Sequence, residues 1–325
     1  MNPTPKKPTK NLTVVSWNQE NNGKGDSARR CRGHELLKSL NPSAVLRQEM
    51  WDAGSHGGEI LFELEEILGL RGALGRRSCT AVFFDFTQFA VVRDWQDSVG
   101  PDWLLPPTAL TLRYRPAGPT ALPIVVASYH LPYASSEKRL AEAEWLTTWA
   151  DKAWQTPDGR KVILPMIGAG DHNSYPVPGT PGDPVVPELE SISDLPHRLH
   201  RSYLGPNGTR LMDTRPDDVL RTAGLQDVAR YWATAAHGSK QAVAPTVNAS
   251  DAHGPGSRID RAYVTPQLLP ALTGVDVIEV DPDLSDHHIL RFTLDREVVA
   301  DILNERPATT SSSSQAAKSP AQGES

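Results

Sequence analysis

The sequence contains only two cysteines, Cys31 and Cys79, which are too few for a disulfide framework and lack the spacing of a zinc site. It has no apolar run near the roughly 18 residues that a membrane-spanning helix needs. The first residues are polar, and no apolar run typical of a signal peptide follows them. The formal net charge is −6, which excludes a protein that holds nucleic acid by overall positive charge alone. We therefore expect a soluble, cytoplasmic protein without a membrane partner.

The composition is that of an ordinary folded protein, with 38% hydrophobic and 22% charged residues in a chain of 325. A chain of this length can form one large core, and no break in composition divides it. The 24 glycines and 28 prolines exceed the usual share and predict long loops. We expect a flexible N-terminus at 1–10, one folded domain at 11–306, and a disordered tail at 307–325, where Ser, Thr and Ala predominate.

Short β-branched segments alternate with helical segments along the expected domain. Strands are predicted at 12–17, 44–47, 80–84, 89–92, 109–113, 123–129, 161–167, 258–264, 275–280 and 288–294. Helices are predicted at 29–40, 58–70, 136–154 and 216–223, with a long loop rich in proline and glycine from 171 to about 207. The four consecutive strands between 80 and 129 favour an antiparallel meander. The pattern indicates an α/β (α+β) fold, a four-layered α/β sandwich of two mixed, largely antiparallel β-sheets packed face to face with helices outside.

Polar residues that can carry chemistry stand where the predicted strands end or begin. They are Asn18, Glu49, His130, Asp171, Asn173, Asp260, Asp286 and His287. Each alone is compatible with an ordinary turn, but α/β folds collect their active sites at sheet ends. Carboxylates and amides supply the hard oxygen ligands that Mg²⁺ prefers, and a histidine backed by a carboxylate suits acid–base chemistry. Together these residues predict metal-assisted attack of water on a phosphate ester.

Six short motifs carry a resemblance to a known family, and they cover residues 11 to 296. They are Ser16-Trp17-Asn18, Gln48-Glu49, Tyr129-His130-Leu131, Gly170-Asp171-His172-Asn173, Ser257-Arg258-Ile259-Asp260 and Leu284-Ser285-Asp286-His287. In these motifs and their order the chain resembles the endonuclease/exonuclease/phosphatase family, which has the deoxyribonuclease I-like fold. The resemblance implies a phosphoric ester hydrolase that depends on Mg²⁺ or Mn²⁺. It places Asn18, Glu49 and Asp286 at the metal, with Glu49 as the firmest ligand.

The resemblance also implies a role for each of the remaining candidate residues. Asp171 would orient or activate the attacking water, and Asn173 would hold the phosphate. His130 would contact the scissile phosphate. His287 would be the second catalytic imidazole, oriented by Asp260.

The chain departs from the family pattern at a few positions. His172 stands where the family usually has an aromatic residue, and the loop at 250–256 is longer and richer in glycine than expected. We expect these departures to affect the choice of substrate more than the type of reaction. His288 follows His287 directly, and adjacent strand residues point to opposite faces, so we expect His288 to be structural.

The substrate class stays open at this point. Nucleic acid is the leading substrate, and a small nucleotide, lipid or sugar phosphate is the alternative; an inactive binding module on the same fold is the third interpretation. Contacts to a phosphate backbone and ordinary surface charge are equally good interpretations of Arg29, Arg30, Arg32, Arg76 and Arg77. A substrate lid is the function suggested for the long-loop residues His197, Arg198, His200, Arg201 and Arg210. We expect a monomer.

Overall fold

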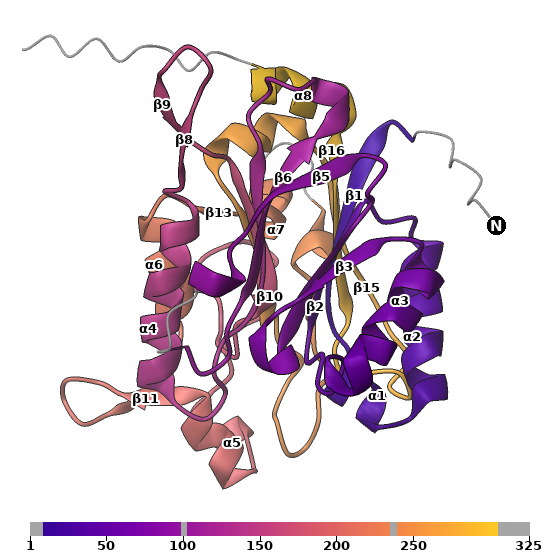
Figure 1. Ribbon diagram of the computed structural model, residues 1–325. Helices are drawn as coiled ribbons and strands as arrows, with labels where there is room; N and C mark the ends of the chain where they lie inside the picture. Colours follow the sequence, from indigo (N-terminus) through magenta and orange to yellow (C-terminus); the bar gives the residue numbers. More distant parts are fainter. Residues whose placement is uncertain (1–8, 99–102, 235–238, 305–325) are drawn as a thin grey trace, which may run out of the picture.

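The structure is a computed structural model that describes residues 9–98, 103–234 and 239–304. Two six-stranded sheets form its centre (Figure 1). The strand order of the first sheet is β15 (Leu272–Ile278), β16 (Ile289–Asp295), β1 (Asn11–Asn18), β2 (Ala44–Gln48), β4 (Thr80–Phe84) and β3 (Arg71–Leu74). That of the second sheet is β13 (Gln226–Asp227), β14 (Asp260–Val264), β10 (Met166–Asp171), β7 (Ile124–His130), β6 (Thr108–Tyr114) and β5 (Phe89–Asp94). The predicted tail at 307–325 and most of the predicted flexible N-terminus lie outside the described residues.

Helices cover the outer face of each sheet and complete the four layers (Figure 1). The first sheet is covered by α2 (Ser27–Ser39) and α3 (Glu59–Leu68), and the second by α4 (Ser136–Leu146) and α6 (Arg215–Thr222). The other helices are α1 (Asn21–Lys24), α5 (Leu195–His200), α7 (Val228–Thr234) and α8 (Arg296–Asn304). The predicted four-layered sandwich is therefore confirmed. Within the described ranges, no helix has both the length and the apolar character needed to cross a bilayer.

The central strands are apolar on both faces because each sheet lies between two other layers. Val14 packs in the core between the sheets, whereas its neighbour Val15 packs under α2 and α3. Val126 and Val125 on β7 divide in the same way between the inner core and the core under α4. Successive side chains of a strand point to opposite faces, so burial on both sides produces the continuous apolar runs seen in the sequence.

The predicted four-stranded meander is wrong in one strand. β5, β6 and β7 are antiparallel neighbours in the second sheet, but β4 lies in the first sheet between β2 and β3. The chain crosses from one sheet to the other in the tight turn at 85–88, where Phe89 N donates to Asp85 O. In the sequence this turn resembles the turn of a β-hairpin. Only the pairing of β4 with the distant strand β2 shows that the chain passes from one sheet to the other.

The helix predicted at 136–154 is too long. It ends at Leu146, followed by a 3-10 turn at Thr147–Trp149 and by a hairpin of β8 (Ala153–Gln155) and β9 (Lys161–Ile163). A turn at Thr156-Pro157-Asp158-Gly159 closes the hairpin, since Thr156 N donates to Arg160 O. The predicted strand 161–167 is likewise divided at Pro165 into β9 and β10. The long loop also contains α5 and β11 (Ser202–Leu204), which pairs with β12 (Arg210–Met212).

Candidate active site

The candidate residues follow the carboxyl ends of one parallel strand pair in each sheet. In the first sheet β1 and β2 are parallel, and Asn18 and Glu49 stand at their ends. In the second sheet β7 and β10 are parallel and end at His130 and Asp171. Because the sheets pack face to face, the four ends meet: Asn18 Nδ2 donates across the sandwich to Asp171 Oδ2 at 3.3 Å.

The antiparallel neighbours of these strands add the remaining residues. Asp260 begins β14 and lies opposite Asp171 in the strand register. β16 runs antiparallel to β1, so the segment before it, which holds Asp286 and His287, arrives at the same end of the sandwich. Trp17 Nε1 on β1 donates to the main-chain oxygen of His287 at 3.0 Å and fixes that segment. The topology thus gathers residues from six separate stretches of sequence.

Asp260 and His287 form a buried hydrogen-bonded pair. The distance from His287 Nδ1 to Asp260 Oδ2 is 2.8 Å, and Asp260 is only 1% exposed. Burial alone would lower the pKa of His287, but the carboxylates of Asp260 and Asp171 raise it to about 10. Burial raises the pKa of Asp260, yet its proximity to the imidazolium keeps the pair as an ion pair. Nδ1–H therefore donates to Asp260, and Nε2–H faces Asp171 at 3.8 Å.

Asp171 lies between the two histidines. Its Oδ2 atom is 3.5 Å from His130 Nε2 and 3.8 Å from His287 Nε2, and its Oδ1 accepts from Asn173 N at 2.7 Å. Burial would raise the pKa of Asp171, but His287, His130 and Arg201 lower it below its ordinary value. An ionised carboxylate between two imidazoles can accept a hydrogen bond from a water and orient it.

Asn173 holds His130 through its side-chain amide. Nδ2 lies 3.0 Å from His130 Nε2 and donates to the main-chain oxygen of Leu131 at 2.9 Å. The bond to the Leu131 carbonyl uses one amide hydrogen and fixes the orientation of the Asn173 amide beside His130.

Asn18 and Glu49 supply oxygen atoms suited to a divalent cation. Asn18 Nδ2 donates to Glu49 Oε1 at 3.1 Å, while Asn18 Oδ1 is buried without a partner. Glu49 has a positive φ of 55°, which is rare for a residue with a long side chain, and such strain concentrates at functional sites. Its Oε2 accepts from Asn21 N at 2.6 Å. The unpartnered oxygen and the carboxylate fit a hard cation such as Mg²⁺.

Two groups of side chains at this end can offer ligands to a metal. Asp171, Asp260 and His287 have ligand atoms within 4.8 Å of one another. In that group Nδ1 of His287 is already bonded to Asp260. Asn18 and Glu49 form the second group, with Asp286 exposed beside them at the rim. The second group contains oxygen donors only, which are the ligands that a hard cation such as Mg²⁺ prefers.

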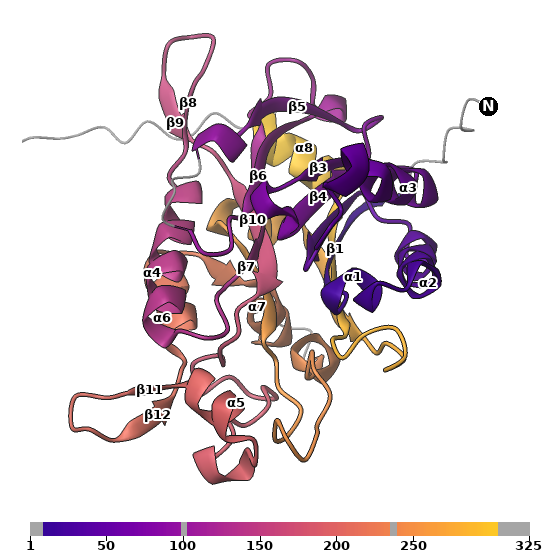
Figure 2. The same cartoon turned by 60° about the horizontal axis from the view of Figure 1, so that its bottom comes forward.

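The residues border a cleft of about 590 Å³. It lies at the end of the sandwich near α1 and α5, two helices whose positions can be followed in Figure 2. Six of the eight predicted residues line it: Glu49, His130, Asp171, Asn173, Asp286 and His287. Asn18 and Asp260 lie behind this lining and hold Glu49 and His287 from below. The opposite wall comes from the loop at 247–257 and from the segment that contains α5.

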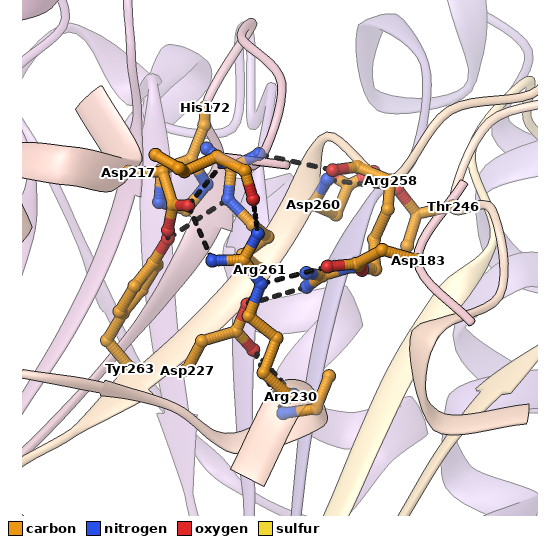
Figure 3. Close-up of polar contacts among 12 residues, drawn as sticks. His172, Asp183, Asp217, Asp227, Arg230, Thr246, Arg258, Asp260, Arg261 and Tyr263 are labelled. Atoms are coloured by element: carbon orange, nitrogen blue, oxygen red, sulfur yellow. Dashed lines mark hydrogen bonds and ion pairs between the residues drawn. The ribbon is translucent and has the colours of Figure 1, made fainter. Parts of the chain in front are cut away.

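A buried network of arginines and aspartates lies behind Asp260 (Figure 3). Arg258 donates to Asp183 at 2.7 Å and to Asp227 at 2.8 Å, and Arg230 donates to Asp183 at 2.9 Å and to Asp217 at 2.8 Å. Burial acts against the charge of Arg258, but the two carboxylates raise its pKa. Because Arg258 is two residues from Asp260, the network fixes the start of β14.

Two hydroxyl groups that are not among the predicted site residues support the site. Thr246 Oγ1 accepts from Asp260 N at 2.9 Å, and Ser285 Oγ donates to Asn18 O at 2.8 Å while accepting from His287 N at 3.1 Å. Ser285 belongs to the last motif and ties the segment before β16 to the end of β1, within the first sheet. Thr246 lies outside every motif, and only its position in space shows its role.

His172 has a different environment from the one its position suggested. It is fully buried between Tyr129 and Tyr263, with Nε2 at 3.1 Å from Tyr129 Oη and Nδ1 at 3.0 Å from Gly170 O. It does not line the cleft, so His172 is not placed to contact a substrate there directly. His288 is also held internally, since its Nδ1 accepts from Val280 N at 3.1 Å.

Arg29 and Arg30 are structural residues. Arg29 pairs with Glu20 at 3.1 Å, Arg30 pairs with Glu63 at 3.0 Å, and both arginines are buried. Of the residues in the suggested lid, His197 and Arg201 line the cleft. Arg198 instead donates to the Ile192 carbonyl.

Comparison with solved structures gives the same fold. An endonuclease/exonuclease/phosphatase family protein from Bacteroides thetaiotaomicron has a TM-score of 0.53, is 18% identical, and is matched over 87% of this chain and 94% of its own. D. rerio TDP2 complexed with single-strand DNA product has a TM-score of 0.54 at 14% identity, over 88% and 99% of the two chains. An AP endonuclease from Archaeoglobus fulgidus has a TM-score of 0.53 at 15% identity, over 87% and 99%. The fold is thus that of the family that the motifs resemble.

Comparison of sequences alone does not identify a family for this chain. No family model matches the chain. A segment of 93 residues is 31% identical to the mouse protein Tubulinyl-Tyr carboxypeptidase 1. That match includes 27% of this chain and spans about a quarter, 24%, of the length of the mouse protein.

Proposed function

We propose that this chain is a member of the endonuclease/exonuclease/phosphatase family that hydrolyses phosphodiester bonds, with nucleic acid as substrate and a divalent cation as cofactor. The observation that carries the proposal is the continuous line of contacts Asp260–His287–Asp171–Asn18–Glu49 across the floor of the cleft. It joins an imidazolium, an ionised carboxylate and an oxygen-rich cation site in one place. The active domain would be the predicted one at 11–306.

Glu49, with Asn18 Oδ1 and Asp286 beside it, would hold Mg²⁺ or Mn²⁺. A bound ion of this kind supplies Lewis-acid stabilisation of the charge that builds on the phosphate. The buried, unpartnered Asn18 Oδ1 supports this assignment, because a buried oxygen without a partner is costly unless a ligand satisfies it.

Asp171 would orient the water that attacks the phosphorus. Its Oδ2 atom accepts from the water, while Oδ1 stays bonded to Asn173 N. His287, charged and held by Asp260, would donate from Nε2–H to a phosphoryl oxygen and stabilise the developing negative charge. His130, fixed by Asn173, would contact the phosphate from the other side.

The neighbours with the same fold support a phosphoester substrate. They are an endonuclease/exonuclease/phosphatase family protein, an AP endonuclease and TDP2 complexed with single-strand DNA product. Those activities belong to those proteins. We extend a phosphoester activity to this chain only because the six motifs and the contacts in the cleft also support it.

A panel of substrates tests the proposal. The purified full chain is incubated with Mg²⁺ or Mn²⁺ and plasmid DNA, single-stranded RNA or bis-p-nitrophenyl phosphate. We expect cleavage of at least one nucleic acid, and loss of cleavage in Asp171→Asn. Asp276→Asn is the matched control, because Asp276 pairs with Arg291 at 2.6 Å outside the cleft. Cleavage that persists in Asp171→Asn would contradict the site assignment.

A small phosphate ester is the second candidate substrate. Arg29 and Arg30, for which contact with a nucleic-acid backbone was one of two interpretations, are instead buried in internal ion pairs. The net charge of −6 also disfavours long polyanions. Hydrolysis of bis-p-nitrophenyl phosphate without cleavage of DNA or RNA would favour this candidate.

A further inference from the structure

In the described part of the chain, Arg201 has a buried guanidinium for which the structure gives no hydrogen bond and no ion pair. The residue directly follows α5 and is 7% exposed, and its Nε and Nη1 atoms are buried without a hydrogen bond. In the part of the chain that the structure describes, each of the seven other buried arginines donates to a carboxylate or a carbonyl oxygen. Arg201 is the exception, and a buried charge without a partner is costly.

The unpaired guanidinium faces the cleft that contains the catalytic residues. Arg201 lines the same cavity as Asp171 and His287. It is near enough to Asp171 to contribute to the lowered pKa of that carboxyl, after the larger effects of burial, His287 and His130. The charge of Arg201 is therefore directed toward the place where the proposed reaction occurs.

Aromatic rings surround Arg201 on this side of the cleft. The guanidinium carbon lies 5.6 Å from the ring centre of Tyr133. Tyr133 Oη is 3.2 Å from His197 Nδ1, and the His197 ring stacks on His253 with ring centres 4.1 Å apart. Burial and the nearby Arg201 lower the pKa of His197 to about 3, so the stacked imidazole is neutral. The wall therefore combines the positive charge of Arg201 with the flat rings of Tyr133, His197 and His253.

The wall is already formed in the free protein. The loop that carries His253 is closed by main-chain hydrogen bonds between Ser250 and Gly254. It is tied to the segment before α5, because Asp194 N donates to Ala252 O at 3.1 Å. Figure 2 shows this loop and α5 side by side at the same end of the sandwich. A preformed site loses little conformational entropy when its ligand binds, because its side chains and loops are already ordered.

We infer that Arg201 binds a second phosphate group of the substrate, next to the scissile one, with the rings of Tyr133, His197 and His253 against the attached nucleoside. A guanidinium can bind two phosphate oxygens at once, and rings of this kind stack on bases. The inference rests on the proposed function and makes it more specific. The second phosphate is either the next one along a nucleic-acid strand or a terminal phosphate of a small nucleotide.

Three synthetic substrates test the inference by kinetics. The first is thymidine 5′-(p-nitrophenyl phosphate), which has one phosphate; the second carries an added 3′-phosphate; the third continues from the 3′ position into a second thymidine through a phosphodiester. We expect the second phosphate to raise kcat/KM about 10- to 100-fold, as a charge-assisted bond does. A gain with the 3′-phosphate alone indicates a terminal phosphate, and a gain with both indicates a strand.

Arg201→Gln should abolish that gain, and Arg201→Lys should retain part of it. The matched control is Arg198→Gln, on α5 three residues before Arg201, whose guanidinium donates to Ile192 O and does not line the cleft. The measured quantity is the ratio of kcat/KM between substrates, so a general loss of activity cancels. An equal ratio in wild type and Arg201→Gln would overturn the inference.

Phosphate binding without catalysis provides an independent readout. In EDTA, pyrophosphate should raise the melting temperature of the wild type and of Arg198→Gln, but not that of Arg201→Gln. A wild type that hydrolyses none of the substrates but shows this shift contradicts the proposed function and leaves the phosphate site standing. Equal shifts in all three proteins, or none in any, would contradict the role of Arg201.

Discussion

Asp260→Asn should remove most of the catalytic contribution of His287 while leaving the fold in place. The carboxylate accepts from His287 Nδ1 at 2.8 Å and is the main reason that the pKa of this buried histidine is raised. A neutral amide fits the same space but does not stabilise the imidazolium. We expect turnover to fall by about 10² to 10⁴, the range for a positioned acid–base group.

The stabilities of the variants should follow a different order. His287→Ala leaves the carboxylate of Asp260 buried and unpaired, with Oδ1 already without a partner. Breaking a buried pair from one side costs about 3–5 kcal/mol of unfolding free energy. Asp260→Asn removes the charge itself and should cost less. The double variant should therefore be more stable than His287→Ala, although it is about as inactive.

Initial rates on bis-p-nitrophenyl phosphate and urea unfolding measure the two effects separately. In a unit of two residues, the double variant should be little slower than the slower single variant. Asp276→Asn, which breaks a partly exposed pair with Arg291, should cost no more than about 1 kcal/mol and leave the rate unchanged. Fully additive rate losses, or a normal rate in Asp260→Asn, would refute the pairing of Asp260 with His287.

Three further predictions concern other parts of the structure. Glu49→Gln should raise the Mg²⁺ concentration needed for half-maximal activity by at least tenfold, as loss of a charged ligand does, and an unchanged metal dependence would exclude Glu49 as a ligand. Burial and Arg47 lower the pKa of His34 to about 3, below its value in the unfolded chain, so the free energy of unfolding falls as the pH falls below about 6.5. By linkage, the wild type should lose about 2 kcal/mol more than His34→Gln between pH 7.5 and pH 5. Equal losses of the two proteins in urea unfolding would refute this prediction. Arg139 donates to Asp213 at 2.7 Å and both are fully buried, so Arg139→Met should lower the unfolding free energy by about 3–5 kcal/mol, whereas a loss below 1 kcal/mol would show that this pair does not hold α4 in place.

The positions of the central strands and of the main site residues could be predicted from sequence because both leave local signals. Strands buried on two faces, such as β1 with Val14 and Val15, are continuous apolar runs. The polar residues that interrupt or follow such runs stand out, and Asn18 and Asp171 were identified in this way. Their meeting across the two sheets also requires the topology, which the six ordered motifs supplied through the family resemblance.

Features that depend on long-range partners could not be predicted. Asp183 and Arg258 are 75 positions apart, and nothing in either neighbourhood indicates their hydrogen bond. The membership of β4 in the first sheet depends on its pairing with β2, not on the turn that follows it. Arg201 was named among several basic residues of one loop, but only burial and the absence of a partner distinguish it from Arg198.

Restoration of activity by metal tests the central claim most directly. The full chain is stripped with EDTA, and hydrolysis of bis-p-nitrophenyl phosphate is measured while Mg²⁺ or Mn²⁺ is added back to wild type and to Asp171→Asn. We predict no hydrolysis in EDTA, full recovery in the wild type, and a rate at least about 10² lower in Asp171→Asn at every metal concentration. Hydrolysis that continues in EDTA, or equal recovery in the two proteins, would contradict a metal-dependent phosphoesterase built on this cleft.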